Sequence, residues 1–243
     1  MRASTIIVVP CYNEASRLAA PPFVEFLTAH ADLALLFIDD GSTDRTPEIL
    51  DSIASQAAGQ VTVQRLVENR GKAEAVRTGI LAAMDRDPRR VAYWDADLST
   101  PLDAALVFTT VLESNPTVDV VMGARVKLLG RNIRRRLARH YAGRLFATAA
   151  SLRLGLPVYD TQCGAKMFRV NETVRGLFRK PFRTRWIFDV ELLARYVAAV
   201  GASEAERRII EVPLATWSDV PGSKLTAGHA VRAAWDLFRL SPD

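Results

Sequence analysis

The sequence lacks any run of about 20 uncharged apolar residues, the length that a helix needs to cross a membrane. It also enters the strand-like run Thr5–Val9 almost at once, without the charged region and apolar core of a signal peptide. Its two cysteines, Cys11 and Cys163, lie far apart and lack metal-ligand spacing, which excludes a disulfide-rich framework and favours free thiols. We therefore expect a cytoplasmic protein that is soluble or peripheral to a membrane.

Acidic residues are absent between Val120 and Tyr159, although the whole sequence contains 27 of them. The same segment contains nine cations, namely Arg125, Lys127, Arg131, Arg134, Arg135, Arg136, Arg139, Arg144 and Arg153. The net charge of +5 thus combines +9 in this segment with −4 in the remainder. A cationic segment on a mildly acidic body indicates an anionic partner, which could be a phosphate, a lipid headgroup or a nucleic acid.

The first half of the sequence alternates short apolar runs with helical patterns. With 243 residues, of which 49 % are hydrophobic, the chain can bury the core of one large domain. The pattern predicts strands at 5–9, 34–38, 61–66, 90–94 and 118–122, and helices at 14–29, 44–57, 72–85 and 102–114. This alternation predicts an α/β fold with a mostly parallel sheet and helices on both faces.

The second half loses this rhythm and is expected to be more irregular. Residues 128–150 read as an amphipathic helix, because Ile133, Leu137, Tyr141 and Leu145 recur every four residues among arginines. Further helical patterns occur at 171–178, 187–200 and 226–239, with a strand near 208–212. We expect one domain over 1–243, with a regular half at 1–123 and a more irregular half at 124–243.

Two carboxylates follow the apolar run Val91–Trp94, in the sequence Asp95-Ala96-Asp97. If the strand continued, the two side chains would point to opposite faces, but a turn would let both converge on one cation. Hard oxygen ligands suit Mg²⁺ or Mn²⁺, which a substrate phosphate and water can complete. The pattern therefore predicts a metal-bridged diphosphate, although Asp-x-Asp alone is also common in solvated turns.

Other polar residues follow the first two predicted strands. Glu14 and Asp40 can accept hydrogen bonds from a base or a ribose, and Tyr12 can cover the face of a base. Lys72 follows Asn69-Arg70-Gly71 at a helix start, where a cation and free backbone N–H groups suit a phosphate. Glu14 could equally complement a helix N-terminus. Because ligands of such sheets bind at the carboxyl ends of the strands, these residues are expected to share one site.

Taken together, these strings resemble the family 2 glycosyltransferases of GT-A fold, which is Rossmann-like. The resemblance is carried by Val-Val-Pro-Cys-Tyr-Asn-Glu, Asp-Asp-Gly-Ser-Thr-Asp, Asn-Arg-Gly-Lys and Asp-Ala-Asp, in that order. Later strings, which begin at Val121, Asp160 and Trp186, are similar to those of the dolichyl- and polyprenyl-phosphate glucosyltransferase branch. The resemblance covers about residues 5–225 and implies a donor-binding half at 1–123 and an acceptor- and membrane-facing half at 124–243.

The resemblance implies a role for individual residues. The nucleotide-sugar donor would be bound by Pro10, Tyr12, Glu14, Ile38, Asp40, Lys72, Asp95, Ala96 and Asp97. Asp95 and Asp97 would hold the metal, and Arg125 would face the donor diphosphate or the acceptor phosphate. Related mannosyltransferases have a glutamine two residues after Asp-x-Asp, where this chain has Ser99, which leaves a third protein ligand in doubt.

The acceptor decides which further residues are needed. A sugar hydroxyl must lose a proton as it attacks, so it needs a carboxylate base such as Asp189 or Glu191. A lipid phosphate is already anionic and needs cations instead. We expect the acceptor to contact Arg125, Arg131, Arg135, Gln162 and Lys166.

The leading hypothesis is an inverting transfer of a hexose, expected to be glucose from UDP-glucose, to polyprenyl or dolichyl phosphate on the cytoplasmic face of an anionic membrane. The catalytic residues would be Asp97, Arg125 and Asp189. Transfer to a sugar hydroxyl, a non-catalytic lipid- or nucleic-acid-binding protein and a scaffold with a degenerate site remain alternatives. Nucleic acid is not an expected partner, because Asp95 and Asp97 would repel a polyanion, and a homo-oligomer is left open.

Overall fold

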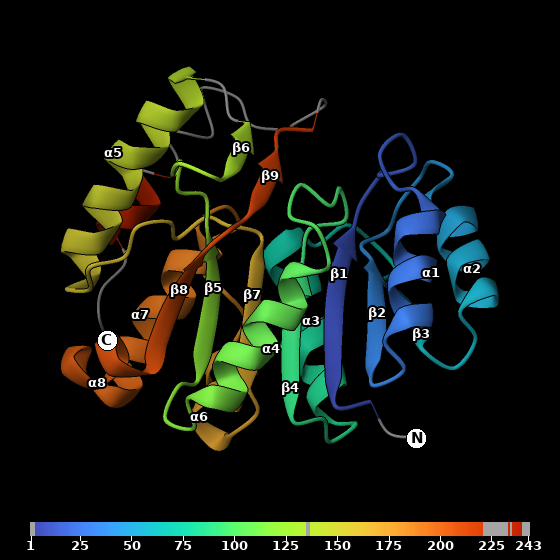
Figure 1. The fold of residues 1–243 in the computed structure, drawn as a ribbon, viewed down its shortest axis with the longest axis horizontal. Coiled ribbons are helices and arrows are strands. Elements are labelled where there is room, and N and C mark those ends of the chain that lie inside the picture. The colour runs from blue at the N-terminus through green and yellow to red at the C-terminus, as the bar shows by residue number, and fades with distance from the viewer. Residues whose placement is uncertain (1–2, 135–136, 221–232, 234, 240–243) are drawn as a thin grey trace. The chain divides into compact units, whose positions relative to one another are not determined.

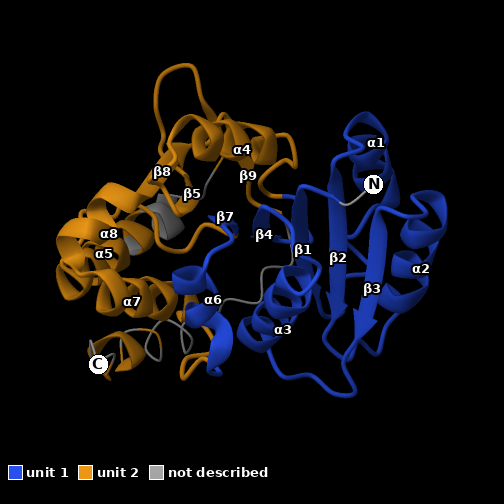
Figure 2. Cartoon of the chain, turned by 90° about the horizontal axis from the view of Figure 1, so that it is seen from below, with its two compact units in different colours: residues 1–98, 165–181 blue, residues 99–164, 182–243 orange. Residues whose placement is uncertain are grey.

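The structure is a computed structural model that describes residues 3–134, 137–220, 233 and 235–239 (Figure 1). For residues 137–140 and 142 it describes the backbone alone. The chain divides into two compact units. Unit 1 comprises residues 1–98 and 165–181, and unit 2 comprises residues 99–164 and 182–243 (Figure 2).

Unit 1 contains five neighbouring strands in the order β3-β2-β1-β4-β7. They are β1 (Thr5–Cys11), β2 (Leu33–Asp39), β3 (Val61–Arg65), β4 (Arg90–Trp94) and β7 (Ala165–Arg169). The first four are parallel to one another, whereas β7 runs antiparallel to β4. The register places Pro10 of β1 opposite Ile38 of β2 and Tyr93 of β4 opposite Lys166 of β7.

The helices of unit 1 are α1 (Ala20–Ala29), α2 (Thr46–Gln56), α3 (Lys72–Met84) and α6 (Glu172–Arg179). A side chain larger than that of Gly79 would not fit at that position of α3, because a Cβ there would meet Val8 at 2.4 Å and Ile38 at 2.7 Å. This close approach brings α3 against β1 and β2. Helices α3 and α6 lie side by side (Figure 2), and Arg175 donates to the carbonyl oxygen of Met84 at 3.2 Å.

Unit 2 contains the parallel pair β5 (Val120–Ala124) and β8 (Ile209–Pro213), and a second pair, β6 (Asn132–Arg134) and β9 (Thr216–Ser218). Its helices are α4 (Ala104–Ser114), α5 (Leu137–Leu154), α7 (Phe188–Val200) and α8 (Ala202–Arg208). Its core includes the buried hydroxyl of Tyr196, which donates to Asp119 at 2.6 Å. Burial, reinforced by this carboxylate, raises the pKa of Tyr196 and keeps it neutral.

The predicted α/β fold with a mostly parallel sheet is confirmed, but two predicted helices are wrong in their bounds. The helix expected at 14–29 begins only at Ala20, because the backbone N–H groups of Arg17 and Leu18 both turn back onto the carbonyl oxygen of Glu14. The helix expected at 128–150 is interrupted by β6, where Ile133 is buried and lies opposite Trp217 of β9. Helix α5 starts after this strand. Most of the helix expected at 226–239 lies outside the described residues.

Candidate functional site

The loops that follow β1 and β2 are braced against each other. Asn13 adopts a left-handed conformation with a φ of 50°. Its side-chain oxygen accepts from the N–H of Thr43 at 2.8 Å, while its own N–H donates to the hydroxyl of Ser42 at 3.0 Å. The N–H of Glu14 donates to the hydroxyl of Thr46 at 2.8 Å. These reciprocal bonds hold the two loops as one polar edge at the carboxyl ends of the strands.

Asp44 ties the same two loops together. Its carboxylate accepts from the hydroxyl of Thr46 at 2.5 Å and from the N–H groups of Thr46 and Ala15 at 2.9 and 3.2 Å. Desolvation by burial raises the pKa of Asp44, but the hydrogen bonds from Thr46 and Ala15 outweigh it and hold that pKa below its usual value. The side chain therefore stays ionised and braces the loops.

Asp40 holds the loop that precedes α3. Its two carboxylate oxygens accept from the N–H groups of Arg70 and Gly71, each at 2.8 Å, and the residue is buried. The neighbouring Gly41 has a φ of 70°, and a Cβ there would meet the backbone of Glu68 at 2.7 Å. Asp40 thus positions the start of α3, and a direct contact between Asp40 and a nucleotide stays a prediction.

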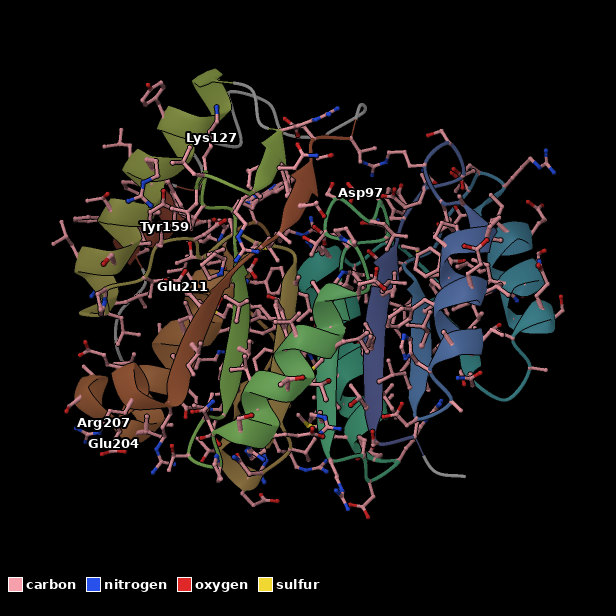
Figure 3. All side chains as sticks on the ribbon, viewed as in Figure 1. Asp97, Lys127, Tyr159, Glu204, Arg207 and Glu211 are labelled. Carbon is pink, nitrogen blue, oxygen red and sulfur yellow. The ribbon has the colours of Figure 1, made fainter. Side chains whose placement is uncertain are left out.

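The backbone turns directly after β4, as a shared site for two carboxylates requires. Leu98 has a φ of 49°, and its N–H donates to the carbonyl oxygen of Asp95 at 3.2 Å. The carboxylate of Asp95 lies 2.5 Å from Nζ of Lys72. That of Asp97 lies 3.4 Å from a guanidinium nitrogen of Arg17 (Asp97 is labelled in Figure 3). Each carboxylate of the motif therefore has a protein cation beside it.

Arg17 is a residue of this site that the sequence analysis missed. Besides Asp97, its guanidinium contacts both carboxylate oxygens of Glu14, at 2.5 and 2.6 Å. Its side chain retains 15 % of its accessible surface and that of Glu14 retains 11 %. The spacing Glu14-x-x-Arg17 could have indicated the first contact, but only the fold shows the second, across 80 residues.

At this turn, two carboxylates, those of Asp95 and Asp97, could bind a divalent cation. In the part of the chain that the structure describes, no group of three or more His, Cys, Asp and Glu side chains could hold a metal. The donor set of Asp95 and Asp97 nevertheless fits Mg²⁺ or Mn²⁺, which commonly take one or two carboxylates and complete their coordination with substrate phosphates and water.

All of the residues expected to bind the donor belong to unit 1. Pro10 and Ile38 are register partners near the ends of β1 and β2, Tyr12 follows β1 directly, and Ala96 is buried between the two aspartates. Strands β1, β2 and β4 are neighbours, so their carboxyl ends meet at one edge. The structure therefore brings these residues to one end of the sheet, as predicted.

The expected acceptor residues are more dispersed. Arg125, directly after β5 in unit 2, forms a two-pronged ion pair with Asp160 at 2.6 and 2.7 Å, and its guanidinium lies 5.3 Å from the ring centre of Trp217. Lys166 is fully buried in β7 of unit 1, with its ammonium 5.4 Å from the ring centre of Tyr93. A direct contact between either cation and the acceptor stays a prediction. Arg131 is exposed in unit 2, and Arg135 lies outside the described residues.

The segment that carries Asp160 is anchored from a second side by Glu211 of β8. The two oxygens of Glu211 accept from the N–H groups of Tyr159 and Asp160, at 2.6 and 2.7 Å (Glu211 and Tyr159 are labelled in Figure 3). Arg144 of α5 covers the ring of Tyr159 at 3.6 Å and donates to its carbonyl oxygen at 2.9 Å. Asp160 in turn accepts from the N–H of Gln162 at 3.2 Å. Gln162 therefore follows a firmly held turn, and its buried side-chain nitrogen makes no hydrogen bond.

The two carboxylates considered as a base lie at the start of α7. Both oxygens of Glu191 are occupied, by the N–H groups of Arg183 and Thr184, the hydroxyl of Thr184 and the guanidinium of Arg195. Glu191 is therefore a structural residue that holds the preceding segment. Asp189 is buried in the first turn of the same helix. Its role as a base stays a prediction.

Helix α5 exposes an apolar face within the cationic segment. Tyr141, Leu145 and Leu152 retain 69, 75 and 81 % of their accessible surface, whereas Ala147, Ala150 and Leu154 on the opposite face are buried. Leu129, in the loop before β6, is fully exposed. No helix in the described part of the chain is long and apolar enough to cross a membrane.

Comparison with known proteins agrees with this arrangement. The sequence profile of Glycosyl transferase family 2 matches residues 6–174, more than half of the chain. The chain belongs to glycosyltransferase family 2. This glycosyltransferase is 32 % identical to the dolichyl-phosphate beta-glucosyltransferase of Drosophila melanogaster, over 96 % of its own length and 73 % of that protein. It is 30 % identical to the enzyme of the same name from Dictyostelium discoideum, over 96 % and 72 %. The predicted resemblance to this branch is confirmed.

Solved structures share the fold of this glycosyltransferase. The glucosyl-3-phosphoglycerate synthase of Mycobacterium tuberculosis, in complex with Mn²⁺, uridine diphosphate and glucosyl-3-phosphoglycerate, superposes with a TM-score of 0.66. The two chains are 18 % identical, and the match covers 97 % of this glycosyltransferase and 77 % of the synthase. The similarity supports the GT-A fold.

Proposed function

We propose that this glycosyltransferase moves glucose, with inversion, from UDP-glucose to dolichyl or another polyprenyl phosphate. The observation that carries the proposal is the acid-free segment of unit 2, which combines nine cations with exposed Tyr141, Leu145 and Leu152. Cations and apolar side chains are the two features that recognise a phosphate on a lipid. The relatives named above support the same acceptor class.

The donor is proposed to bind at the carboxyl ends of β1, β2 and β4. Pro10, Tyr12, Glu14 and Ile38 would contact the nucleotide, and Asp40 would act through the loop that it holds. Asp95 and Asp97 would hold Mg²⁺ or Mn²⁺, which would neutralise charge on the departing diphosphate.

The acceptor phosphate is proposed to need positioning rather than deprotonation. A lipid phosphate is already a nucleophilic anion at neutral pH, so cations that hold it beside the anomeric carbon are the main requirement. Glu191 is fully engaged in structural hydrogen bonds, which leaves Asp189 as the candidate base of the hydroxyl-acceptor alternative. We place the enzyme peripherally on the cytoplasmic face of an anionic membrane, with the exposed face of α5 in contact with lipid.

A direct assay tests this proposal. Purified protein is incubated with Mg²⁺ or Mn²⁺, with UDP- and GDP-sugars in turn, and with dolichyl or undecaprenyl phosphate in detergent. We expect a glucosylated lipid from UDP-glucose and loss of the product in EDTA. Transfer to an oligosaccharide hydroxyl, with no lipid product from any donor, would overturn the proposed acceptor.

A further inference from the structure

Arg17 and Lys72 occupy the two carboxylates that the proposed function assigns to a divalent cation. Nζ of Lys72 lies 2.5 Å from Asp95, and the guanidinium of Arg17 lies 3.4 Å from Asp97. Lys72 is the first residue of α3, and Arg17 comes from the turn between β1 and α1. Two separate connections of unit 1 thus deliver one cation each to a single turn.

A divalent cation at Asp95 and Asp97 would compete with both of these side chains. With Glu14, which also pairs with Arg17, this cluster contains three carboxylates and two cations, so its net charge is −1. An added divalent cation would reverse this net charge to +1 and would repel the guanidinium and the ammonium at short range. The repulsion would be relieved if an anion arrived with the metal, and the donor diphosphate is such an anion.

We propose that Arg17 and Lys72 exchange partners when the donor binds, leaving Asp97 and Asp95 to the metal and moving onto the diphosphate oxygens. This inference rests on the proposed metal-dependent donor site. It assigns Arg17 two functions, since the same side chain pairs with Asp97 before the metal binds and contacts the diphosphate afterwards. Glu14 remains beside Arg17 in both arrangements and limits how far its guanidinium moves.

The exchange has a thermodynamic consequence, because metal and diphosphate each remove an obstacle to the binding of the other. Each therefore binds more tightly in the presence of the other, by the same factor for both. The small protein donor set, with two carboxylates at the turn, acts in the same direction, since diphosphate oxygens complete the coordination.

The test measures binding of Mn²⁺ alone, and of UDP at saturating Mn²⁺, by titration calorimetry on wild-type protein, Arg17→Gln and Lys72→Gln. Removing a competing cation should tighten Mn²⁺ binding by about twofold to fivefold, the range expected of a partly exposed ion pair. Removing a charged donor from the diphosphate should weaken UDP binding by about tenfold or more. The two ligands thus respond in opposite directions.

Arg65→Gln is the matched control. Arg65 forms an exposed ion pair with Asp51 at 2.6 Å in the same unit, so the substitution removes the same charge away from the turn and should change neither affinity. If Arg17→Gln fails to fold because Glu14 loses its partner, the half-exposed Lys72 still provides the test.

Each outcome decides a different point. Opposite changes for Mn²⁺ and UDP in the two variants support the exchange. Weaker Mn²⁺ binding, or unchanged UDP binding, overturns it and leaves the proposed glycosyl transfer intact. Absence of any UDP binding by wild-type protein, with or without Mn²⁺, overturns the assumed UDP donor itself.

Discussion

The turn at residues 95–98 of unit 1 and the cationic segment at residues 120–159 of unit 2 differ in how their charges are neutralised. At the turn, Asp95 and Asp97 each have a cation within hydrogen-bonding or ion-pair distance, and Arg17 also contacts Glu14. In the segment from Val120 to Tyr159, nine cations occur without one acidic residue. The cations of the first arrangement are paired with carboxylates that lie beside them, whereas the cations of the second can be neutralised only by groups outside this segment.

The two regions also differ in how far their apolar side chains are buried. Strands β1, β2 and β4 bury nearly all of their apolar residues, so the loops at their carboxyl ends present mainly polar groups. Helix α5 instead leaves Tyr141, Leu145 and Leu152 exposed. These surfaces are consistent with the proposed ligands, a charged water-soluble donor at unit 1 and a charged acceptor with an apolar body at unit 2.

The largest effect is expected from a substitution in the turn that carries Asp95 and Asp97. Asp97→Ala removes one of the two proposed metal ligands, and we expect transfer to fall by about a thousandfold, because charge on the leaving diphosphate is no longer neutralised. Steady-state rates and a thermal melt provide the measurement. Asp51→Ala removes an exposed acid of the same unit and should keep its activity. Full activity of Asp97→Ala would contradict the metal site.

A second substitution tests whether the ion pair between Arg125 and Asp160 anchors the cationic segment. Arg125 and Asp160 retain 12 and 9 % of their side-chain surface, so Asp160→Asn leaves a nearly buried guanidinium without its carboxylate. We expect a loss of about 3 kcal/mol in the free energy of unfolding, measured in urea. Asp51→Asn breaks an exposed pair and should cost less than about 1 kcal/mol. Equal losses would show that the anchoring of this segment is unimportant.

The third prediction tests whether the exposed apolar face of α5 binds membrane. Replacing Tyr141, Leu145 and Leu152 by glutamine should weaken binding to anionic liposomes by about a hundredfold, if each side chain contributes about 1 kcal/mol at the interface. Stability should not change, because all three are exposed. Co-sedimentation measures the binding. Val67→Gln, at a fully exposed position of unit 1, is the control and should bind like wild type. Undiminished binding of the triple variant would exclude this face.

The smallest effect concerns pH and the bracing of unit 1. The hydrogen bonds of Asp44 hold its pKa below the unfolded value of about 4, so its carboxylate stabilises the fold above that pH. This stabilisation is lost as the pH falls through the lowered pKa. Wild type should therefore melt slightly above Asp44→Asn at pH 6, by less than about 1 kcal/mol because solvent screens this exposed carboxylate, and the difference should vanish in strong acid. A difference that grows on acidification would have the wrong sign.

The sequence predicted the parallel strands of unit 1 and the positions of the polar residues that follow them, because the signals for both are local. Each parallel strand is a continuous apolar run, and the polar residues that follow, such as Glu14 and Asp95, are adjacent to it in the chain. The rule that strand ends meet at one edge then places them together. Arg17 escaped detection because its contact with Asp97 depends on the fold and not on neighbouring sequence.

The second half was harder to predict because its elements depend on distant partners. Ile133 fitted a helical period, but it is paired with Trp217 in a short strand that no local pattern revealed. Lys166 was expected to contact the acceptor and no strand was predicted around it, yet it lies fully buried in β7 opposite Tyr93. Two charged residues in this five-residue strand, Lys166 and Arg169, masked its apolar pattern.

Whether the acceptor is a lipid phosphate is tested by comparing two acceptors that differ only in their phosphate. The enzyme is given UDP-glucose, Mn²⁺ and either dolichyl phosphate or dolichol in the same detergent, and glucose in the lipid extract is measured. If the acceptor is a lipid phosphate that needs cations and no base, dolichyl phosphate is glucosylated and dolichol is not. Asp189→Asn should then retain transfer to dolichyl phosphate. Efficient transfer to dolichol, abolished by Asp189→Asn, would contradict the account.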